Sequence, residues 1–396
     1  MNKTVYSIKK LVILFTIRTT LRYRDSNLSI INTDRNWFNQ RIIKGLNIEL
    51  QMHAADDLLI SVIVTAHNRK EYILEALASI ADQTLDRKFY EVIVVKNYLD
   101  NDIDAQIEKY GYKNILCRET PVGAKLRDAI VKSEGNVIAF LEDDDLFHKD
   151  KLKAVFSYFN TEKSLSMFRN CGEFINKNGQ TYGIYTNNAF EEMKKFKWPD
   201  DFIGRNFRNL KFAIDFNLGL MSVKREALIN KLPFLERVIQ SPDIFVFFSG
   251  LKEGMDIVVD GRVLTFIRRH GNEASMTFGS FKEVDQKRIQ LLEKGMKDKI
   301  ATVDSLDSKF TRDAFWNLFF WVKIEKLLRE HQPRRGVMLE EGASYMRSKY
   351  QISHIIPPFF AFIFTTYMVS PFISRTIFKT FEWLRFSRHS KTFSIG

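Results

Sequence analysis

With 396 residues, of which 45% are hydrophobic and 27% charged, the chain has the composition of a globular protein rather than a disordered one. Its formal net charge of +12 favours anionic partners, such as phosphorylated substrates or an acidic membrane surface. No nucleic acid partner is expected, because the sequence has no zinc-finger spacing, RNP-like motif or basic leucine zipper. The two cysteines, Cys117 and Cys171, form no disulfide framework and predict a reducing compartment.

Residues 1–55 are expected to form a basic N-terminal segment. Its apolar core, residues 11–17, lies between lysines and arginines and is too short to span a bilayer. No small-residue cleavage site follows this core, so we expect an uncleaved surface segment on a cytoplasmic protein.

Residues 56–280 alternate strand patterns with helical patterns. Strands are predicted at residues 58–64, 90–95, 114–117 and 137–141, and the helices between them at residues 71–81, 102–110 and 122–133. This alternation predicts an α/β fold with a doubly wound, mostly parallel sheet. The loops after the strands, at residues 65–69, 96–102 and 142–145, should then converge at one edge of the sheet.

Beyond residue 151 the alternation is less regular. Further strands are predicted at residues 165–175, 182–185, 218–223, 255–259 and 263–267, with a short helix at 243–251. From residue 281 the chain becomes helical and rich in aromatic residues. We therefore expect an α/β domain at 56–280, a helical extension at 281–350 and an apolar tail at 351–396.

The tail contains an apolar run, residues 350–374, that has no lysine, arginine, aspartate or glutamate. Its length approaches the roughly 20 residues that a spanning helix needs, but Pro357, Pro358 and Pro371 interrupt it and basic residues flank both ends. These features favour an interfacial or re-entrant hairpin on an anionic membrane surface. The alternative is a helical hairpin that is buried in a larger soluble core or in an oligomer interface.

Four adjacent acids, Glu142, Asp143, Asp144 and Asp145, follow the predicted strand at 137–141. Adjacent carboxylates repel each other unless a cation or solvent neutralises them. Hard divalent cations prefer carboxylate oxygens, and Mg²⁺ is usually shared between carboxylates and the phosphates of a substrate. The cluster therefore indicates a divalent-metal site, with a solvated acidic turn that caps the next helix as the alternative.

This acidic motif is one of several that occur in a fixed order along the chain. They lie at residues 61–69, 91–95, 123–128, 141–145, 221–227, 241–243 and 268–272, with Ser275 after the last. Over about residues 59–276 the set resembles a family-2 glycosyltransferase of the GT-A fold, with 141–145 as its DxD motif. The resemblance implies that 56–280 is a GT-A catalytic domain of an inverting, nucleotide-sugar-dependent enzyme that uses Mn²⁺ or Mg²⁺.

The resemblance also assigns roles to individual residues. It implies metal ligands at Asp144, Asp145 and His270, with Asp144 ranked first, and nucleotide-sugar contacts at Thr65, Ala66, His67, Asn68, Arg69, Asn97, Lys125, Arg127 and Asp143. The spacing alone leaves the metal pair open, because Glu142-x-Asp144 and Asp143-x-Asp145 both fit. Two residues have structural alternatives: His270 as a histidine satisfied at a strand end, and Arg127 as the partner of a neighbouring acid.

Asp243 is implied as the general base that takes the proton of the acceptor hydroxyl during direct displacement at the anomeric carbon. It precedes the apolar residues 244–248 at a predicted helix start, so an N-terminal cap is its alternative role. Asp215 is the rival for the base.

The sequence departs from the family after the second strand, where the family usually places aspartates that read the base. Here the residues are Lys96 and Asn97. An asparagine still offers an acceptor to the N3–H of uracil, whereas a lysine adds positive charge. UDP is therefore the first expectation, with GDP and dTDP open. The processive-synthase motif Gln-x-x-Arg-Trp is absent, so repeated polymerisation is not expected.

The sequence thus predicts a metal-dependent inverting glycosyltransferase that is peripheral or monotopic on the cytoplasmic face of a membrane. It would move one sugar from a nucleotide sugar to a lipid-linked or glycan acceptor. The alternatives are a polyprenyl-phosphate sugar synthase and a catalytically inactive GT-A scaffold. A nucleotidyltransferase would need a glycine-rich loop after the first strand, and residues 65–69 contain no glycine.

Overall fold

The computed structural model describes residues 58–184, 193–202, 217–269, 280–329, 334–347 and 358–392. The chain divides into two compact units, Met1–Asp56 and Asp57–Gly396, and every described residue belongs to the second. The predicted basic segment at 1–55 therefore lies outside the described residues.

Four parallel strands form the first half of the sheet. They are β1 (Ile60–Ala66), β2 (Tyr90–Lys96), β3 (Lys113–Leu116) and β4 (Val137–Glu142), in the order β3-β2-β1-β4. All of β1 and nearly all of β2 and β4 are buried, as their continuous apolar sequences require of strands that are covered on both faces. The predicted parallel core of the α/β fold is confirmed.

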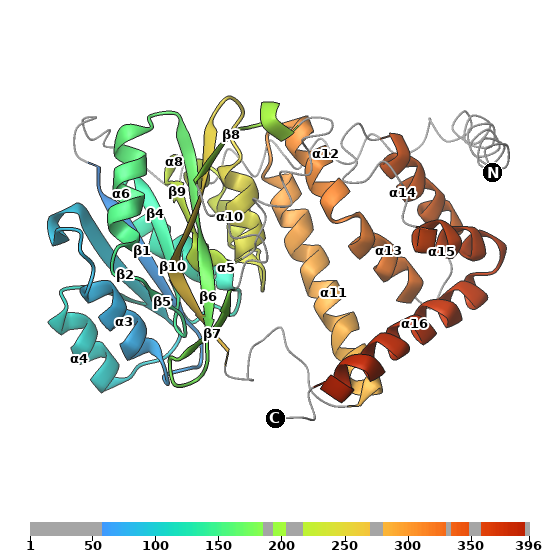
Figure 1. The fold of residues 1–396 in the computed structure, drawn as a ribbon, viewed down its shortest axis with the longest axis horizontal. Helices are drawn as coiled ribbons and strands as arrows, with labels where there is room; N and C mark the ends of the chain where they lie inside the picture. Colours follow the sequence, from blue (N-terminus) through green and yellow to red (C-terminus); the bar gives the residue numbers. More distant parts are fainter. Residues whose placement is uncertain are drawn as a thin grey trace. The chain divides into compact units, whose positions relative to one another are not determined.

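Helices connect these strands and cover both faces of the sheet (Figure 1). They are α3 (Ile73–Ala81), α4 (Asn101–Lys109), α5 (Val122–Lys132) and α6 (Lys151–Thr161), with the short 3₁₀ helix η1 (Arg87–Phe89) before β2. Helices α3, α4 and α6 bury their apolar side chains on one face, whereas α5 packs on the other. Helices α3, α4 and α5 begin within two residues of their predicted starts because their apolar spacing is regular.

The second half of the sheet mixes strand directions. Strand β9 (Met221–Lys224) is antiparallel to both β4 and β6 (Leu165–Ile175), and β6 is parallel to β10 (Asp256–Arg268). The remaining elements of this half are β5 (Leu146–Phe147), β7 (Thr181–Ile184), β8 (Lys194–Lys197), η2 (Asp200–Phe202), η4 (Leu218–Leu220), α8 (Glu226–Ile229), α9 (Leu232–Leu235) and α10 (Pro242–Gly250).

Two predictions for this half were wrong in detail. The strands expected at 255–259 and 263–267 are one strand, β10, which pairs with β6 through register shifts after Asp256 and between Asp260 and Thr265. These shifts accommodate the polar residues 260–262 within the ladder, so the strand continues. Residues 218–220, expected to extend β9, instead form η4.

The described residues after the sheet form the helices α11 (Phe281–Asp304), α12 (Lys309–Leu318), α13 (Phe320–Arg329), α14 (Arg335–Arg347), α15 (Pro358–Val369) and α16 (Pro371–Thr392). Helix α12 joins the core beneath α10, where the rings of Phe248 and Phe315 meet edge to face at 4.7 Å. Helices α13 to α16 share a separate apolar cluster that includes Phe320, Ile324 and Tyr367.

The tail forms a helical hairpin, α15 and α16, and each of these helices begins at a proline, Pro358 and Pro371. Proline suits the first turn of a helix because its missing N–H has no intrahelical acceptor there. Part of the hairpin packs on α13 and α14, as the alternative reading of the tail expected, through Ile363 and Phe378. Among the described helices, none combines the length and apolarity that crossing a membrane requires.

The tightest backbone contact in this fold predicts a stability defect. A Cβ atom at Gly123, in the first turn of α5, would lie 1.8 Å from the carbonyl oxygen of Leu235. Because the obstacle is backbone, we expect Gly123→Ala to lower the free energy of unfolding by about 3 kcal/mol, the upper end of overpacking costs. Urea denaturation followed by circular dichroism measures this.

The matched control is Gly336→Ala in α14, where a Cβ meets no atom within 4 Å. Alanine is the better helix former, so this control should match or exceed the wild-type stability. Equal midpoints for the Gly123 variant and the wild type would contradict the observed contact.

Candidate functional site

The loops after β1, β2 and β4 meet at one edge of the sheet, as predicted. Thr65 and Ala66 end β1, and Asn68 follows with a φ of 56°. The Asn68 backbone N–H donates to Oδ1 of Asn97 at 2.9 Å, and Nδ2 of Asn97 donates to Oδ1 of Asn68 at 2.7 Å. Asparagine tolerates this left-handed backbone better than most residues, so the pair fixes a turn that joins the first two loops.

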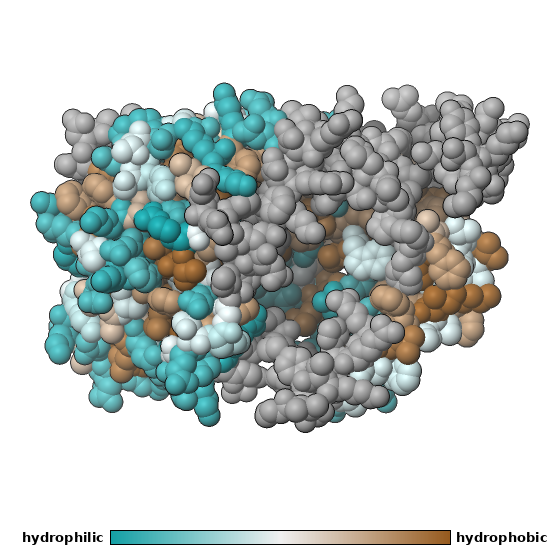
Figure 2. Space-filling model, in the orientation of Figure 1, coloured by the Kyte–Doolittle hydropathy of each residue, from teal (hydrophilic) through white to brown (hydrophobic). Residues whose placement is uncertain are grey.

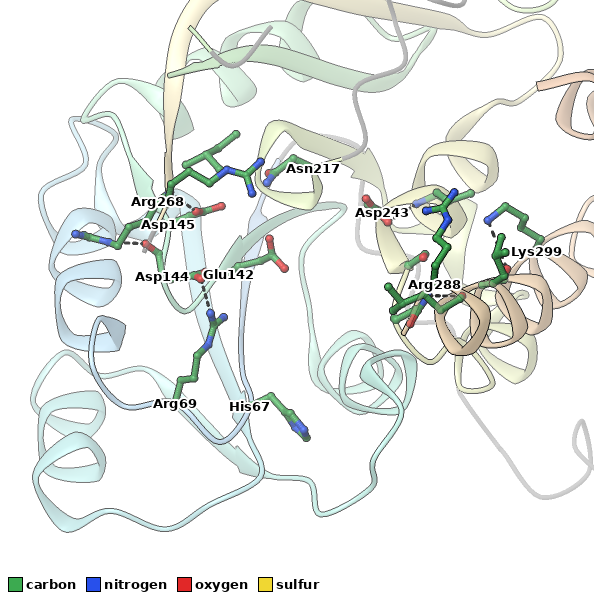
Figure 3. Close-up of a pocket in the computed structure, with 18 of the residues that line it drawn as sticks. His67, Arg69, Glu142, Asp144, Asp145, Asn217, Asp243, Arg268, Arg288 and Lys299 are labelled. Carbon is green, nitrogen blue, oxygen red and sulfur yellow. Dashed lines mark hydrogen bonds and ion pairs between the residues drawn. The ribbon is translucent and has the colours of Figure 1, made fainter. Parts of the chain in front are cut away.

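Arg69 links the same loop to the acid cluster. Its guanidinium lies 2.6 Å from Oδ1 of Asp143 through Nη2 and 2.6 Å from Oδ2 of Asp144 through Nη1. Figure 3 shows this side chain reaching up from the β1 loop to the carboxylates. Charge-assisted pairs of this kind are strong where the acids are shielded from water. All three predicted loops therefore contribute to one site.

The acid cluster is buried, which contradicts the alternative of a solvated turn. Asp143, Asp144 and Asp145 expose 3%, 8% and 2% of their surface. Oδ1 of Asp145 accepts from the backbone N–H of Arg268 at 2.9 Å. Oδ2 of Asp143 and Oδ2 of Asp145 are buried and have no hydrogen-bond partner among the residues that the structure describes. Unpaired buried carboxylate oxygens are costly and mark places that a ligand or ion completes.

The pKa values of the cluster show that its negative charge is only partly compensated. Burial raises the pKa of Asp145 to about 8, and the neighbouring Asp144 carboxylate adds to this. Burial likewise raises the pKa of Asp143 to about 6, although Arg69 opposes the shift. The pKa of Glu142 is raised well above its ordinary value by burial and then by the charges of Asp145 and Asp144. A further cation would relieve this repulsion.

Residues from both halves of the molecule line one cavity of about 680 Å³. Glu142, Asp144 and Asp145 lie on its sheet side, and Asp243 faces them from the opposite wall (Figure 3). That wall also includes Arg288 and Lys299 of α11, which comes from the helical extension. The cavity can therefore hold a ligand between a carboxylate cluster and a separate, single carboxylate.

Asp243 is the second residue of α10, and the residue at the N-cap position is Ser241. Asp243 therefore does not have the capping role that the sequence left open, although its Oδ1 accepts from the backbone N–H of Ile244 at 2.9 Å. Burial raises the pKa of Asp243 to about 7; the hydrogen bond from the backbone N–H of Ile244 and the charge of Lys299 lower it, and the charge of Asp298 adds a small rise. A carboxyl group with this pKa is suited to proton transfer near neutral pH. Asp215, the rival base, lies outside the described residues.

His67 and Lys125 lie on the β1 side of the site. His67 lines the cavity, and its pKa is lowered by burial and by the charges of Lys125 and Arg69. Lys125 is buried, and its Nζ donates to the carbonyl of Glu119 at 3.2 Å. Burial lowers the pKa of Lys125 as well. The lowered pKa keeps His67 neutral near pH 7, so Lys125 and Arg69 are the cations that act on it.

Arg127 takes the alternative role that the sequence left open. Its guanidinium pairs with Glu236 at 2.6 Å and with Glu119 and Asp128 at 2.8 Å each. These three acids raise its pKa, so the charge is neutralised locally. Arg127 thus joins α5 to the segment after α9 rather than lining the described cavity.

Lys96, the departure from the family pattern, is also neutralised. Its Nζ lies 2.7 Å from Oδ1 of Asp104 on α4 and donates to the carbonyl of Tyr98 at 2.7 Å. The side chain is buried, so the expected extra positive charge at the base site is compensated by Asp104. His270, the predicted third metal ligand, lies outside the described residues.

The α11 side of the site was not predicted from the sequence. The predicted catalytic domain ended at residue 280, yet Arg288 and Lys299 line the cavity and Asp298 is buried next to it. The sequence held one sign of this role. Asp298 and Lys299 are adjacent charged residues on the same face of α11 as Leu292 and Gly295, and all four residues are buried. Charged residues among the core positions of an amphipathic helix need a specific partner.

Comparison with known proteins identifies the domain that contains the acid cluster. The family model described as Glycosyl transferase family 2 matches residues 61–231. An uncharacterized glycosyltransferase of Methanocaldococcus jannaschii is 24% identical over 195 residues, which are 48% of this chain and 63% of that protein. A poly(ribitol-phosphate) beta-glucosyltransferase of Bacillus spizizenii is 25% identical over 234 residues, 55% of this chain and 34% of that protein. The matches thus span less than two thirds of these relatives.

Solved structures of residues 1–349 of S. aureus TarS, in complex with UDP and with UDP-GlcNAc, share the fold. Their TM-scores are 0.56 and 0.53 at 14% and 15% sequence identity, and each alignment covers 82% of this chain and 92% of TarS 1–349. This likeness confirms the predicted GT-A fold, including a helical region after the sheet. The model of glycosyl transferase family 2 thus matches the part of the chain that carries the acid cluster, residues 61–231, which is less than half of its length.

Proposed function

We propose that this protein is a metal-dependent inverting glycosyltransferase that moves one sugar from a nucleotide sugar to an acceptor hydroxyl. The observation that supports this most strongly is the arrangement of one cavity, with buried carboxylates on one wall and Asp243 on the other. Transfer with inversion needs a cation at the leaving diphosphate and a base on the opposite side of the sugar. The cavity offers residues for both.

The acid cluster fits a hard divalent cation. It supplies only oxygen donors, and Oδ2 of Asp145 is buried without a partner among the described residues. Asp144 and Asp145, which line the cavity, would hold Mn²⁺ or Mg²⁺, with His270 as a further candidate ligand. When bound, such an ion stabilises the negative charge that develops on the departing diphosphate. Asp143 and Arg69 would orient the β1 loop beside it, since they are paired with each other.

The loop at the ends of β1 and β2 would hold the nucleotide. Thr65, Ala66, His67 and the Asn68–Asn97 pair form this edge, and Lys125 lies close enough to His67 to lower its pKa. UDP remains the first expectation for the nucleotide, supported by the UDP and UDP-GlcNAc complexes of TarS. Asn97 would accept from the N3–H of uracil.

Asp243 would act as the general base. Its pKa of about 7 means that a substantial fraction is ionised at neutral pH, while the group remains basic enough to accept a hydroxyl proton. The proton moves to a carboxylate oxygen of Asp243 as the acceptor oxygen attacks the anomeric carbon. Attack from the face opposite the diphosphate inverts the anomeric configuration.

We expect the acceptor to be a phosphate-bearing glycan, because of the charge on the cavity wall that carries Asp243. Lys299 lines this wall, is buried, and has no carboxylate within ion-pair distance among the described residues. Its Nζ is 4.6 Å from the centre of the Phe319 ring and 3.5 Å from the carbonyl of Gly295. The relatives named as poly(ribitol-phosphate) transferases act on an acceptor of this class, and the net charge of +12 is consistent with it.

A polyprenyl-phosphate sugar synthase and a catalytically inactive scaffold are the competing functions. An acceptor phosphate is already ionised and needs no base, so Asp243 would be dispensable in the synthase. The shielded acid cluster and the raised pKa of Asp243 argue against an inactive scaffold, because both are costly features without a ligand.

We also propose that the tail attaches the protein to the cytoplasmic face of a membrane, where a lipid-linked acceptor would lie. Phe372 and Val369 at the α15–α16 turn expose 77% and 76% of their surface, and Ile373, Phe381 and Trp383 are also exposed. Figure 2 shows apolar side chains gathered at the end of the molecule that α15 and α16 form. Large exposed aromatic side chains near basic residues such as Lys379 are typical of interfacial helices.

The metal proposal predicts the effect of removing one cluster acid. Asp144→Ala should abolish sugar transfer and metal-dependent binding of UDP-sugars, because the cation loses a ligand that lines the cavity. The fold should survive, since the change also relieves like-charge repulsion. Isothermal titration with Mn²⁺ and UDP-GlcNAc, together with a transfer assay, measures both effects.

Asp102→Ala provides a matched control, because Asp102 is an exposed acid in the first turn of α4. It should retain wild-type binding and transfer. Full activity of the Asp144 variant, or of the wild type in excess chelator, would rule out the metal site.

The base proposal predicts a loss of turnover without a loss of donor affinity. Asp243→Asn should lower kcat by about 10²–10⁴-fold, because an amide cannot accept the proton. In the wild type, kcat should fall as pH decreases through about 7, where Asp243 becomes protonated. This fall, the acid limb of the pH profile, should be absent in the variant. Steady-state rates between pH 5 and pH 9 report both.

Three outcomes separate the alternatives. A collapse of donor affinity would make Asp243 structural, and a turnover defect in Asp215→Asn alone would move the base to Asp215. Wild-type turnover of Asp243→Asn, with a polyprenyl phosphate as acceptor, would favour the synthase.

The membrane proposal predicts that exposed apolar residues of α16 carry vesicle binding. Phe372→Asp with Ile373→Asp should reduce binding to vesicles of mixed neutral and anionic phospholipids by at least about tenfold, since each buried side chain contributes about 1.5–3 kcal/mol. High salt should weaken but not abolish binding of the wild type, because only the electrostatic part is screened. Cosedimentation with vesicles measures the partition.

Leu99→Asp is the control, since Leu99 is 65% exposed in the α/β domain, far in sequence from the tail. This variant should bind vesicles like the wild type. If the wild type itself does not sediment with vesicles, the exposed face has another role and the membrane proposal fails.

A further inference from the structure

Helix α11 contributes a buried carboxylate beside the proposed base. Asp298 is 1% exposed, and its two oxygens accept three consecutive backbone N–H groups. Oδ1 accepts from Ile239 at 2.7 Å, and Oδ2 accepts from Gln240 and Ser241 at 3.0 Å each. Among the described residues no cation pairs with Asp298, so these amides supply its compensation.

The segment that Asp298 holds leads directly to Asp243. Ser241 is the N-cap residue of α10, and Asp243 is the second residue of that helix. A second contact from α11 supports the same segment, because Nε2 of Gln240 donates to the carbonyl of Leu291 at 3.1 Å. Three bonds to adjacent amides fix both the position and the orientation of the backbone, which one bond cannot do.

The opposite side of the segment is held by α5. The backbone N–H of Gly123 donates to the carbonyl of Val238 at 2.9 Å, and that of Val122 donates to Ile239 at 3.5 Å. The approach is so close that a Cβ at Gly123 would overlap the backbone of Leu235. The segment before Asp243 is therefore clamped between a helix of the α/β domain and a helix of the extension.

We propose that Asp298 is a positioning residue for the reaction: by holding the amides of residues 239–241, it sets the place of Asp243 across the cavity from the acid cluster. The extension helix α11 is thereby part of the catalytic centre, although it lies beyond the matched family domain at 61–231. This inference rests on the proposed role of Asp243 as base.

The substitution Asp298→Asn tests this role with little change of volume. The amide of asparagine places an N–H₂ group against backbone N–H groups, so residues 239–241 should be held less tightly. We therefore expect kcat to fall about tenfold to a hundredfold, with the affinity for the nucleotide sugar unchanged. Amide hydrogen exchange should speed up at residues 239–241 while the protection of β1 and β4 stays as in the wild type. Mass spectrometry of exchange and steady-state kinetics give these readouts.

The pH profile separates positioning from a general loss of stability. The charged groups that act on Asp243 include Lys299, Asp298 and, from the acid cluster, Glu142. The Asp298 charge raises the pKa of Asp243, so its removal should move the acid limb of kcat to lower pH. Asp298→Glu keeps the charge but displaces the carboxylate, so it should lower kcat and leave the limb in place.

Two controls complete the experiment. Asp304→Asn alters an exposed acid near the end of α11 whose nearest ion-pair contact, to Arg237, is 3.6 Å, and it should behave like the wild type. In the Asp243→Asn background, Asp298→Asn should cause no further loss of kcat, because a misplaced base and a missing base are not additive.

The outcomes distinguish this inference from the proposed function. Wild-type kcat and an unmoved acid limb in Asp298→Asn would overturn the positioning role while leaving glycosyl transfer intact. If the wild type turns over no nucleotide sugar, the proposed function fails, and hydrogen exchange alone decides whether Asp298 holds the segment. Unchanged exchange at residues 239–241 would then overturn the inference as well.

Discussion

The concentration of carboxylates at the end of β4 is the constraint on which the rest of the site depends. The strand is apolar and central, so it must be buried, and its direction carries Glu142 to Asp145 into a shielded edge of the sheet. Like charges that are crowded away from water raise each other's pKa. Arg69 offsets this for Asp143 and Asp144, whereas Oδ2 of Asp145 is buried without a hydrogen-bond partner among the described residues, so further positive charge is favourable beside it.

The two walls of the cavity come from different parts of the chain. The sheet side is built from the loops after β1, β2 and β4, which the parallel sheet brings to one edge by its topology. The opposite side is built by α10 and α11 and is held together by tertiary contacts to Asp298 and Gly123. A change in α11 can therefore alter the wall that carries Asp243 without touching the loops on the sheet side.

Local pattern predicted the α/β core well because its elements follow from local physics. Continuous apolar runs such as 60–66 and 90–96 can only be strands covered on both faces, and helices of regular spacing must cover them. The bulge in β10 and the 3₁₀ turn at 218–220 escaped prediction, since both depend on pairing with neighbouring strands. The acid cluster was predicted because four acidic residues that are adjacent in the sequence must repel each other.

The Lys96–Asp104 pair, the Arg127–Glu236 pair and the α11 wall were not predicted, because these residues meet only in the folded chain. Arg127 meets Glu236 and Lys96 meets Asp104 only after folding, so the sequence left the pairing of Arg127 with an acid as an alternative and gave Lys96 no partner. Asp298 differs, since it lies on the buried face of an amphipathic helix where a charge is unfavourable unless something specific receives it. A charge at a core position of a helix is thus a sequence-level sign of a backbone or ligand partner, and here that partner is the segment leading to Asp243.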